Sequence, residues 1–215
     1  MPTQFLTDKS LQLEAAFFGY ALDTGPGFAE PGVADHYAPD RGFVLKHVDL
    51  ALTIDPVAHT LEGTARLHIQ PLPTGMGDVV LDFDDLRIDG VTNSGGEALE
   101  FSESDGRLTV QGVHGNGEAI TVKWHGSPTR GLYFTGATAA EPDRSPMAWS
   151  QCQDEDAHYF FPCIDHPSTK CTWTMAFTVP SGMQAIGNGR FVDWSGALGV
   201  FVSTIVLSGW CARGI

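Results

Sequence analysis

The sequence predicts an all-β protein, built as an antiparallel curved sheet or a β-sandwich. Apolar and polar residues alternate over several short segments, which is the period of a strand with one buried face. Pairs that favour turns, such as Asp-Pro, Asp-Gly and Asn-Gly, separate these segments at close spacing. The 215 residues can bury a substantial core, and we find no internal repeat or linker. One β domain is therefore expected.

The first alternating segments lie in the amino-terminal half. Residues 48–54 alternate strictly, and the Asp55-Pro56 pair ends that segment. The residues expected on buried faces are Val48, Leu50, Leu52, Ile54, Ala65, Leu67, Ile69, Val79, Leu81, Phe83, Leu86 and Ile88. Asp105-Gly106 predicts a tight hairpin, because such turns need residues that tolerate a positive φ.

Two further alternating segments and a second hairpin follow. Residues 119–125 and 172–179 alternate clearly. Their expected buried residues are Ile120, Val122, Trp124, Trp173, Met175, Phe177 and Val179. Residues 185–192 predict a hairpin that turns at Asn188-Gly189.

The two ends of the chain differ from this pattern. Residues 1–35 are rich in Gly and Pro and predict an irregular leader, with a possible short helix over 9–18. Residues 196–215 form a divergent apolar tail, whose β-branched residues favour a last buried strand. The core domain is expected over 36–195.

The net charge and the cysteine content limit the classes of binding partner and the cellular compartment that we expect for this chain. A formal net charge of −14 disfavours nucleic acid and anionic membranes, and favours either solubility or a cationic ligand such as a peptide amino terminus. The first ten residues lack the pattern of a secretory signal, and residues 196–210 are too short to span a bilayer. Four cysteines then predict thiols in a cytoplasmic protein rather than disulfides.

Residues 149–173 contain most of the reactive side chains. Five of these side chains are of the types that bind zinc: Cys152, His158, Cys163, His166 and Cys171. Their spacing is unsuited to a metal site, because no C-x-x-C occurs and only Cys163 and His166 are close in sequence. We therefore expect buried thiols and no metal ligand, with a small zinc site as the weaker alternative.

No catalytic residue is predicted. A nucleophilic Cys163 would need a nearby base, and its apolar neighbours Phe161, Pro162 and Ile164 favour the unreactive thiol. The sequence lacks a G-x-S-x-G elbow, a P-loop and a G-x-G-x-x-G motif. Adjacent carboxylates at 154–156 rarely face each other across a sugar, so glycoside chemistry is also disfavoured.

Several segments together resemble one known family. Residues 36–69 and 81–91, the GLYFT element at 131–135, the SQCQ and FPCIDHPS runs within 149–180, and AIGNGR at 185–190 carry the resemblance. They resemble the saddle-like amino-terminal β domain of zinc aminopeptidases of the aminopeptidase N type, which include leukotriene-converting hydrolases. The resemblance covers residues 36–195.

This resemblance implies a substrate-binding role for two glutamines. In the family, an acid or amide at the position of Gln153 helps to hold the free amino group of the substrate, and Gln151 is its companion. A side-chain carbonyl can accept a hydrogen bond from an ammonium group. Pro162 and Pro167 would stiffen the loop, and Asp165 would cap its backbone donors. The alternative is that both glutamines only bind loop backbone.

The sequence departs from the family in its catalytic motifs. The resemblance implies zinc ligands and a base in an H-E-x-x-H sequence on a separate catalytic domain, yet no His here precedes Glu, and no G-A-M-E-N-like strand is present. We therefore predict a chain without cofactor that is inactive alone and shapes a peptide cleft. Its expected partners are a catalytic domain, the peptide amino terminus, or a second copy through an exposed apolar face.

Two alternatives remain open. The chain could be a stand-alone β-sandwich interaction module that recruits a partner by strand addition. The end of the sequence is compatible with a natural truncation, a disrupted reading frame or a deliberately cut piece.

Overall fold

The structure is a computed structural model that describes residues 41–73, 77–113, 119–153, 155–195 and 198–203. Side chains are described as far as residue 193. These residues belong to one structural unit, residues 39–215. The predicted leader, its possible helix over 9–18 and the end of the tail lie outside the described residues.

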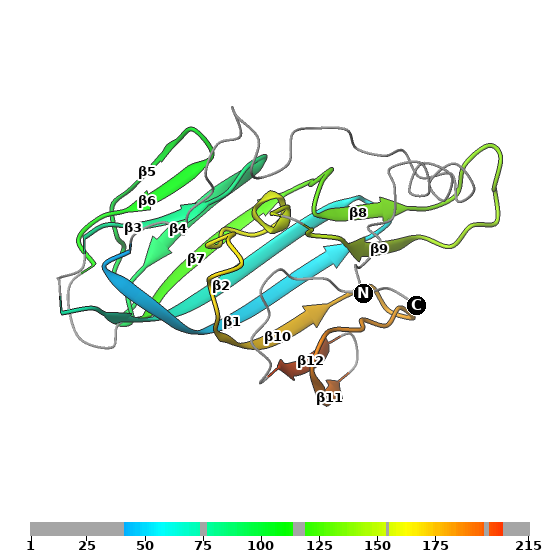
Figure 1. Ribbon diagram of the computed structural model, residues 1–215. Coiled ribbons are helices and arrows are strands. Elements are labelled where there is room, and N and C mark those ends of the chain that lie inside the picture. Colours follow the sequence, from blue (N-terminus) through cyan, green and yellow to red (C-terminus); the bar gives the residue numbers. More distant parts are fainter. Residues whose placement is uncertain (1–40, 74–76, 114–118, 154, 196–197, 204–215) are drawn as a thin grey trace, which may run out of the picture. The chain divides into compact units, whose positions relative to one another are not determined.

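The described residues form strands and a single 3-10 turn, and none of them lies in an α-helix (Figure 1). The elements in chain order are β1 (Phe43–Asp55), β2 (Thr60–Pro71), β3 (Val79–Asp82), β4 (Leu86–Thr92), β5 (Phe101–Ser104), β6 (Arg107–Val110), β7 (Ala119–Gly126), β8 (Leu132–Thr135), β9 (Met147–Ser150), η1 (Ala157–Tyr159), β10 (Thr172–Thr178), β11 (Arg190–Ser195) and β12 (Leu198–Ser203). The predicted all-β class is confirmed.

The strands form three sheets. The largest has seven strands in the order β11-β12-β10-β1-β2-β7-β4, the second has the order β3-β6-β5, and β8 pairs with β9 in a ribbon. Every pair is antiparallel except β1 with β10, which run parallel. The sequence did not predict this parallel pair.

The predicted buried faces are confirmed. All nineteen residues that alternation assigned to the interior are at most 9 % exposed. Val79 and Leu81 of β3 belong to the same core cluster as those of the seven-stranded sheet, and Leu108 and Val110 of β6, which were not predicted, join them. Burying one such side chain contributes about 1.5–3 kcal/mol.

Turn chemistry explains the ends of two strand pairs. Asp55 ends β1, where its Oδ1 accepts hydrogen bonds from the backbone of Val57 at 2.8 Å and of Ala58 at 3.0 Å. The hairpin between β5 and β6 turns at Asp105 and Gly106, whose φ angles are 50° and 72°. This is the predicted hairpin, with the positive φ angles that it requires.

The hairpin predicted at Asn188-Gly189 is wrong. Gly189 has a positive φ of 111°, but residues 185–186 are not in a strand, and β11 pairs with β12 instead. The backbone of Met183 donates to the Pro180 carbonyl at 3.1 Å, which turns the chain out of the β-ladder after β10. In the tail, the predicted strand is present over the residues of β12, next to β10.

Candidate functional site

The segment between β9 and β10, residues 151–171, is called the glutamine loop here. Its middle is fixed to the end of β3 by two backbone hydrogen bonds, from Asp82 to the Cys163 carbonyl at 2.7 Å and from Cys163 to the Asp82 carbonyl at 3.1 Å. The backbone of Asp84 donates to the His158 carbonyl at 3.1 Å. The loop therefore continues the second sheet as an extra partner of β3.

The inner side of the glutamine loop belongs to the core. Phe160 and Phe161 are at most 2 % exposed and contact each other edge to face, with ring centroids 4.9 Å apart. The indole Nε1 of Trp124, on β7, donates to the Phe160 carbonyl at 3.0 Å. The loop is thus fixed by apolar burial and by a buried hydrogen bond together.

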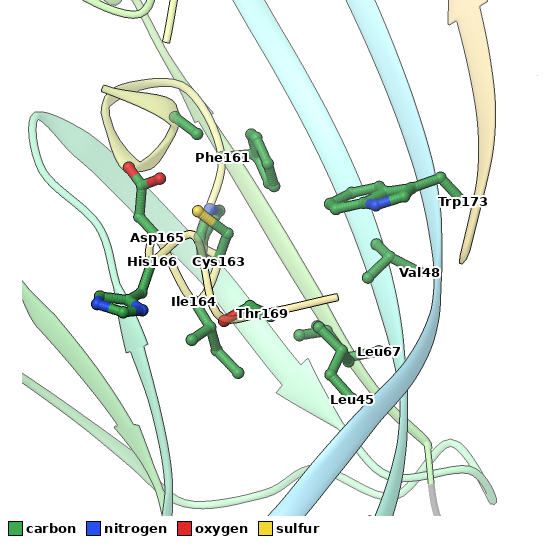
Figure 2. Close-up of a pocket in the computed structure, with 12 residues that line it drawn as sticks. Leu45, Val48, Leu67, Phe161, Cys163, Ile164, Asp165, His166, Thr169 and Trp173 are labelled. Carbon is green, nitrogen blue, oxygen red and sulfur yellow. The ribbon is translucent and has the colours of Figure 1, made fainter. Parts of the chain in front are cut away.

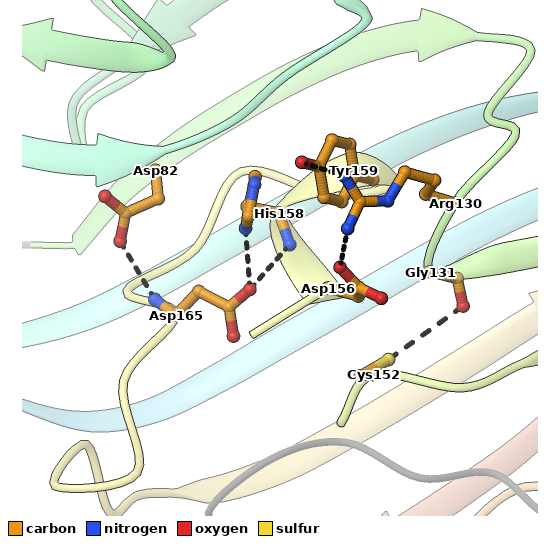
Figure 3. A network of polar contacts seen from close by, with 8 residues as sticks. All are labelled: Asp82, Arg130, Gly131, Cys152, Asp156, His158, Tyr159 and Asp165. Carbon is orange, nitrogen blue, oxygen red and sulfur yellow. Dashed lines mark hydrogen bonds and ion pairs between the residues drawn. The ribbon is translucent and has the colours of Figure 1, made fainter. Parts of the chain in front are cut away.

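A polar network fixes the outer side of the loop (Figure 3). Asp165 Oδ2 accepts hydrogen bonds from the backbone of His158 at 3.0 Å and from its Nδ1 at 2.8 Å. The backbone of Asp165 donates in turn to Asp82 Oδ2 at 3.0 Å. The expectation that Asp165 caps backbone donors of the loop is confirmed.

Arg130 joins the start of η1 to the segment before β8. Its guanidinium contacts Asp156 Oδ1 at 2.9 Å and donates to the Tyr159 hydroxyl at 2.7 Å (Figure 3). Its charge also lies over the Tyr159 ring, 4.2 Å from the centroid. Arg130 therefore fixes both ends of η1 relative to β8.

The two predicted glutamines lie where the loop leaves β9. The Gln151 backbone donates to the Gly131 carbonyl at 2.9 Å, and the Asp156 backbone donates to the Cys152 carbonyl at 3.2 Å. Gln153 lies within the turn that this second bond closes, and it is exposed, whereas Gln151 is half-buried. The structure thus anchors the loop at Gln151, Cys152 and Asp156, and the Gln153 side chain lies at the surface.

The pKa of His158 follows from the same network. Burial lowers the pKa of His158. The hydrogen bond to Asp165 and the negative charges of Asp165, Asp82 and Asp84 raise it by more than burial lowers it, so the net shift of the pKa is upward. A raised pKa in the folded state means that protonation of His158 stabilises the fold. That contribution is complete below the unfolded-state pKa of about 6.5 and disappears as the pH rises through the folded-state value.

We predict that His158→Gln destabilises the protein more at about pH 5 than at about pH 9. The expected loss at the acidic pH is roughly 1 kcal/mol or more, because a hydrogen bond to a buried carboxylate is removed. Urea unfolding at both values measures it. The control, His125→Gln, removes an exposed pair with Asp89 and should cost less. An equal loss from His158→Gln at the two pH values would contradict the assignment.

The cysteines of the loop are packing residues. Cys152, Cys163 and Cys171 are buried thiols, and no disulfide joins them. Burial raises the pKa of Cys163 well above its usual value, and Asp165 and Asp82 raise it further. Burial also raises the pKa of Cys171 to about 12. The prediction that these residues are buried free thiols is confirmed, and the raised pKa of Cys163 disfavours this residue as a nucleophile.

The structure does not bring the five possible zinc ligands together. Among the described residues, no group of three or more His, Cys, Asp or Glu side chains is placed to hold a metal ion. His158 is occupied with Asp165, and His166 Nδ1 contacts the Ser168 hydroxyl at 2.7 Å.

A small cavity of about 40 Å³ lies beneath the loop (Figure 2). Cys163, Phe161 and Trp173 line it, together with leucines and valine of β1 and β2. The Trp173 Nε1 atom is buried and has no hydrogen-bond partner among the described residues. A space of this size accepts a water molecule rather than a substrate.

A larger pocket of about 400 Å³, called the β9 pocket here, lies beside the start of the glutamine loop. Its residues come from β1, β8, β9, β10, the residues next to these strands, the glutamine loop and the 183–186 segment: Leu52, Ile54, Pro56, Leu132, Ser145, Pro146, Met147, Ala148, Trp149, Ser150, Phe160, Phe177, Val179, Met183, Gln184, Ala185 and Ile186. Phe160 belongs to both the loop and the pocket, which links the two features.

Comparison with known proteins decides the family. The model of the peptidase M1 N-terminal domain matches residues 35–195. The chain belongs to this family. It is 25 % identical over 180 residues to leucine aminopeptidase 2-2 of Scheffersomyces stipitis, covering 80 % of this chain and 27 % of that protein. It is 24 % identical over 160 residues to leukotriene A-4 hydrolase of Xenopus laevis, covering 70 % and 26 %. This M1 N-terminal domain thus spans about a quarter of these relatives.

Solved structures agree on the fold. Native leukotriene A4 hydrolase of yeast superposes with a TM-score of 0.70 at 19 % identity, over 82 % of this chain and 30 % of that one. An M1 zinc metallopeptidase of Deinococcus radiodurans, bound to a Tyr-Ser-Ala substrate, superposes with a TM-score of 0.63 at 22 % identity, over 77 % and 40 %. At these identities the likeness concerns the fold of the M1 N-terminal domain.

The sequence analysis missed the residues that position the loop. One such cluster consists of Arg130, Asp156 and Tyr159, and no sequence motif predicted it. Asp82 also contacts Asp165, which is 83 residues away in the sequence. The only local signal was the dense run of charged and aromatic residues at 154–161. A single sequence contains no information on which distant residues meet.

Proposed function

We propose that this chain acts as the non-catalytic amino-terminal domain of an M1 aminopeptidase and presents Gln153 to the free amino terminus of a peptide. The observation that supports the proposal is an exposed Gln153 in a segment that backbone hydrogen bonds anchor at Gln151, Cys152 and Asp156. Membership of the M1 N-terminal domain family supports it as well.

The surroundings of Gln153 suit a cationic ligand. The amide oxygen of a glutamine can accept a hydrogen bond from an ammonium group, and a formal net charge of −14 attracts cations. Because the bonds at Gln151, Cys152 and Asp156 anchor the segment before binding, they reduce the conformational entropy that is lost when a peptide binds. Gln151, half-buried at the base of the turn, would support Gln153 from the adjacent position.

Hydrolysis is proposed to need a partner. The described residues offer no set of ligands that fits zinc, so no catalytic step is assigned to them. We propose that a catalytic domain, with its own zinc to polarise the carbonyl and activate water, packs against this domain and completes the peptide cleft. Gln153 would then form part of one wall of that cleft.

A cytoplasmic location is part of the proposal. The three described cysteines form no disulfide, which supports a reducing compartment. In the part of the chain that the structure describes, there is no helix with the length and apolar character needed to cross a bilayer.

Binding of a short peptide tests the proposal. We expect Tyr-Ser-Ala to shift the NMR signal of the Gln153 side-chain amide in the full chain, with a dissociation constant of about 1 mM, as suits one or two hydrogen bonds at an exposed site. Gln153→Ala should weaken this binding about fivefold or more, since one charge-assisted hydrogen bond is lost, and the backbone amide of Cys152, present in both proteins, reports the binding of each.

The matched control is N-acetylated Tyr-Ser-Ala, which lacks the ammonium group. It should produce no shift at Gln153. Equal binding of the acetylated and free peptides would refute recognition of the amino terminus, while leaving the family assignment intact.

A further inference from the structure

Two consecutive residues, Arg130 and Gly131, contact the glutamine loop on both sides of Gln153. Before Gln153, the Gly131 carbonyl accepts the hydrogen bond from the Gln151 backbone at 2.9 Å. After Gln153, the Arg130 guanidinium contacts Asp156 Oδ1 at 2.9 Å (Figure 3). One short segment before β8 therefore holds both ends of the stretch that contains Gln153.

The Asp156 carboxylate is used for the ion pair with Arg130. Asp156 precedes η1, where an aspartate often caps the first backbone donors of a helix. In the described part of the chain its side chain makes no capping hydrogen bond. The carboxylate, 20 % exposed, is paired with Arg130 instead. The ion pair therefore determines where this carboxylate lies.

Arg130 is itself held by Tyr159. Its Nη1 donates to the Tyr159 hydroxyl at 2.7 Å, and its charge lies 4.2 Å from the centroid of the ring. An arginine can make these contacts and the pair with Asp156 together, because its planar guanidinium has five N–H donors, whereas lysine has a single ammonium. Contacts in two directions restrict the Arg130 rotamers, although the side chain is 56 % exposed.

The backbone bond at Asp156 is the weaker of the two backbone anchors. It joins Asp156 N to the Cys152 carbonyl at 3.2 Å, the upper limit of the usual range, whereas the bond from Gln151 to Gly131 measures 2.9 Å. A long bond at the surface opens easily. The ion pair with Arg130 supplies a second anchor at this end.

We propose that Arg130 is a positioning residue for Gln153, and that its ion pair with Asp156 raises the affinity for the peptide amino terminus. This inference rests on the proposed function of Gln153. Arg130 does not bind the peptide ammonium itself, since two cations repel each other. It anchors Asp156, and it neutralises the Asp156 charge so that this carboxylate does not compete with the Gln153 amide for the ammonium.

Hydrogen exchange in the free chain tests the positioning without a peptide. The ion-pair variant combines Arg130→Met with Asp156→Asn, and the loss of one positive and one negative charge leaves the net charge at −14. We expect the protection factor of the backbone amide at position 156 to fall about threefold or more, because only the long backbone bond remains. The Gln151 amide should keep its protection, since its bond to Gly131 involves no Arg130 side-chain atom.

The matched control combines Arg144→Met with Glu141→Gln. These two residues form an ion pair of the same kind, at 2.8 Å, within the loop between β8 and β9. The net charge is again unchanged. The control should leave the protection factor at position 156 as it is in the unaltered chain.

Binding of Tyr-Ser-Ala, followed at the Cys152 backbone amide, then measures the effect on recognition. We expect the dissociation constant to rise about threefold or more in the ion-pair variant, in the range that one partly exposed ion pair supplies, and to stay unchanged in the control. Arg130→Lys should give an intermediate value, because an ammonium can pair with Asp156 but cannot also contact Tyr159 in the same way. Circular dichroism verifies that each variant folds.

An unchanged protection factor at position 156 in the ion-pair variant would overturn the inference, whatever the peptide data show. Unchanged affinity in that variant would overturn it as well, and would leave recognition at Gln153 standing. Equal binding of free and acetylated Tyr-Ser-Ala by the unaltered chain would instead refute the proposed function, and the exchange data would then decide separately whether Arg130 anchors Asp156.

Discussion

Replacing Gly131 with alanine is expected to lower the free energy of unfolding by about 3 kcal/mol or more. Gly131 has a φ of 70°, which costs about 1–2 kcal/mol for a residue with a Cβ atom. The new Cβ would also overlap with the carbonyl oxygen of Asp156, which the surrounding loop fixes. Urea unfolding followed by tryptophan fluorescence measures the loss.

The control for Gly131→Ala separates these two causes. Gly112 has nearly the same φ, 68°, but a Cβ there would meet no atom within 4 Å. Gly112→Ala should therefore cost only the conformational part, about 1–2 kcal/mol. Equal losses at the two positions would show that the glutamine loop moves freely away from Gly131, and would contradict the anchoring of the loop next to Gly131.

Replacing Gly63 with alanine is expected to cost about 3 kcal/mol, through steric overlap alone. Gly63, on β2, pairs with Trp124 on β7, and an added Cβ would overlap with carbons of the indole ring. Trp124 is 1 % exposed, and its Nε1 atom is bound to the Phe160 carbonyl. The ring cannot move without breaking this bond to the glutamine loop.

Gly90→Ala is the matched control for Gly63→Ala. Gly90 also lies in a strand of the large sheet, β4, but a Cβ at this position would meet nothing within 4 Å. Its replacement should change stability by less than about 1 kcal/mol, and the reduced freedom of the unfolded chain favours stabilisation. A small effect at Gly63 would mean that Trp124 has room to shift, against the packing described here.

Strands were predictable wherever one face is buried. Residues alternate in β1, β2, β7 and β10 because every second side chain is buried. This pattern can be recognised from a few consecutive residues. The turn at Asp105 and Gly106 was predictable for a similar reason, since a positive φ restricts the residue type. Local physics was sufficient for these elements.

Partners distant in sequence were not predictable. Gly189 adopts a positive φ, but a positive φ shows only that the chain bends there. It does not show which strand β11 pairs with, and β11 pairs with β12 rather than with the residues before Gly189. The contacts of Asp82 with the glutamine loop bridge about eighty residues. The positions of Gln151 and Gln153 within the site came from family resemblance, because periodicity contains no information on loops.

The parallel pairing of β1 with β10 has a consequence for synthesis on the ribosome. At about 5–20 residues per second, roughly ten seconds separate the appearance of β1 from that of β10. The strands β1, β2, β7 and β4 can pair in this order during the interval, but the edge of β1 that later pairs with β10 has no neighbour. A nascent chain that stalls before Thr172 would present an open row of amides and carbonyls, which other chains can join.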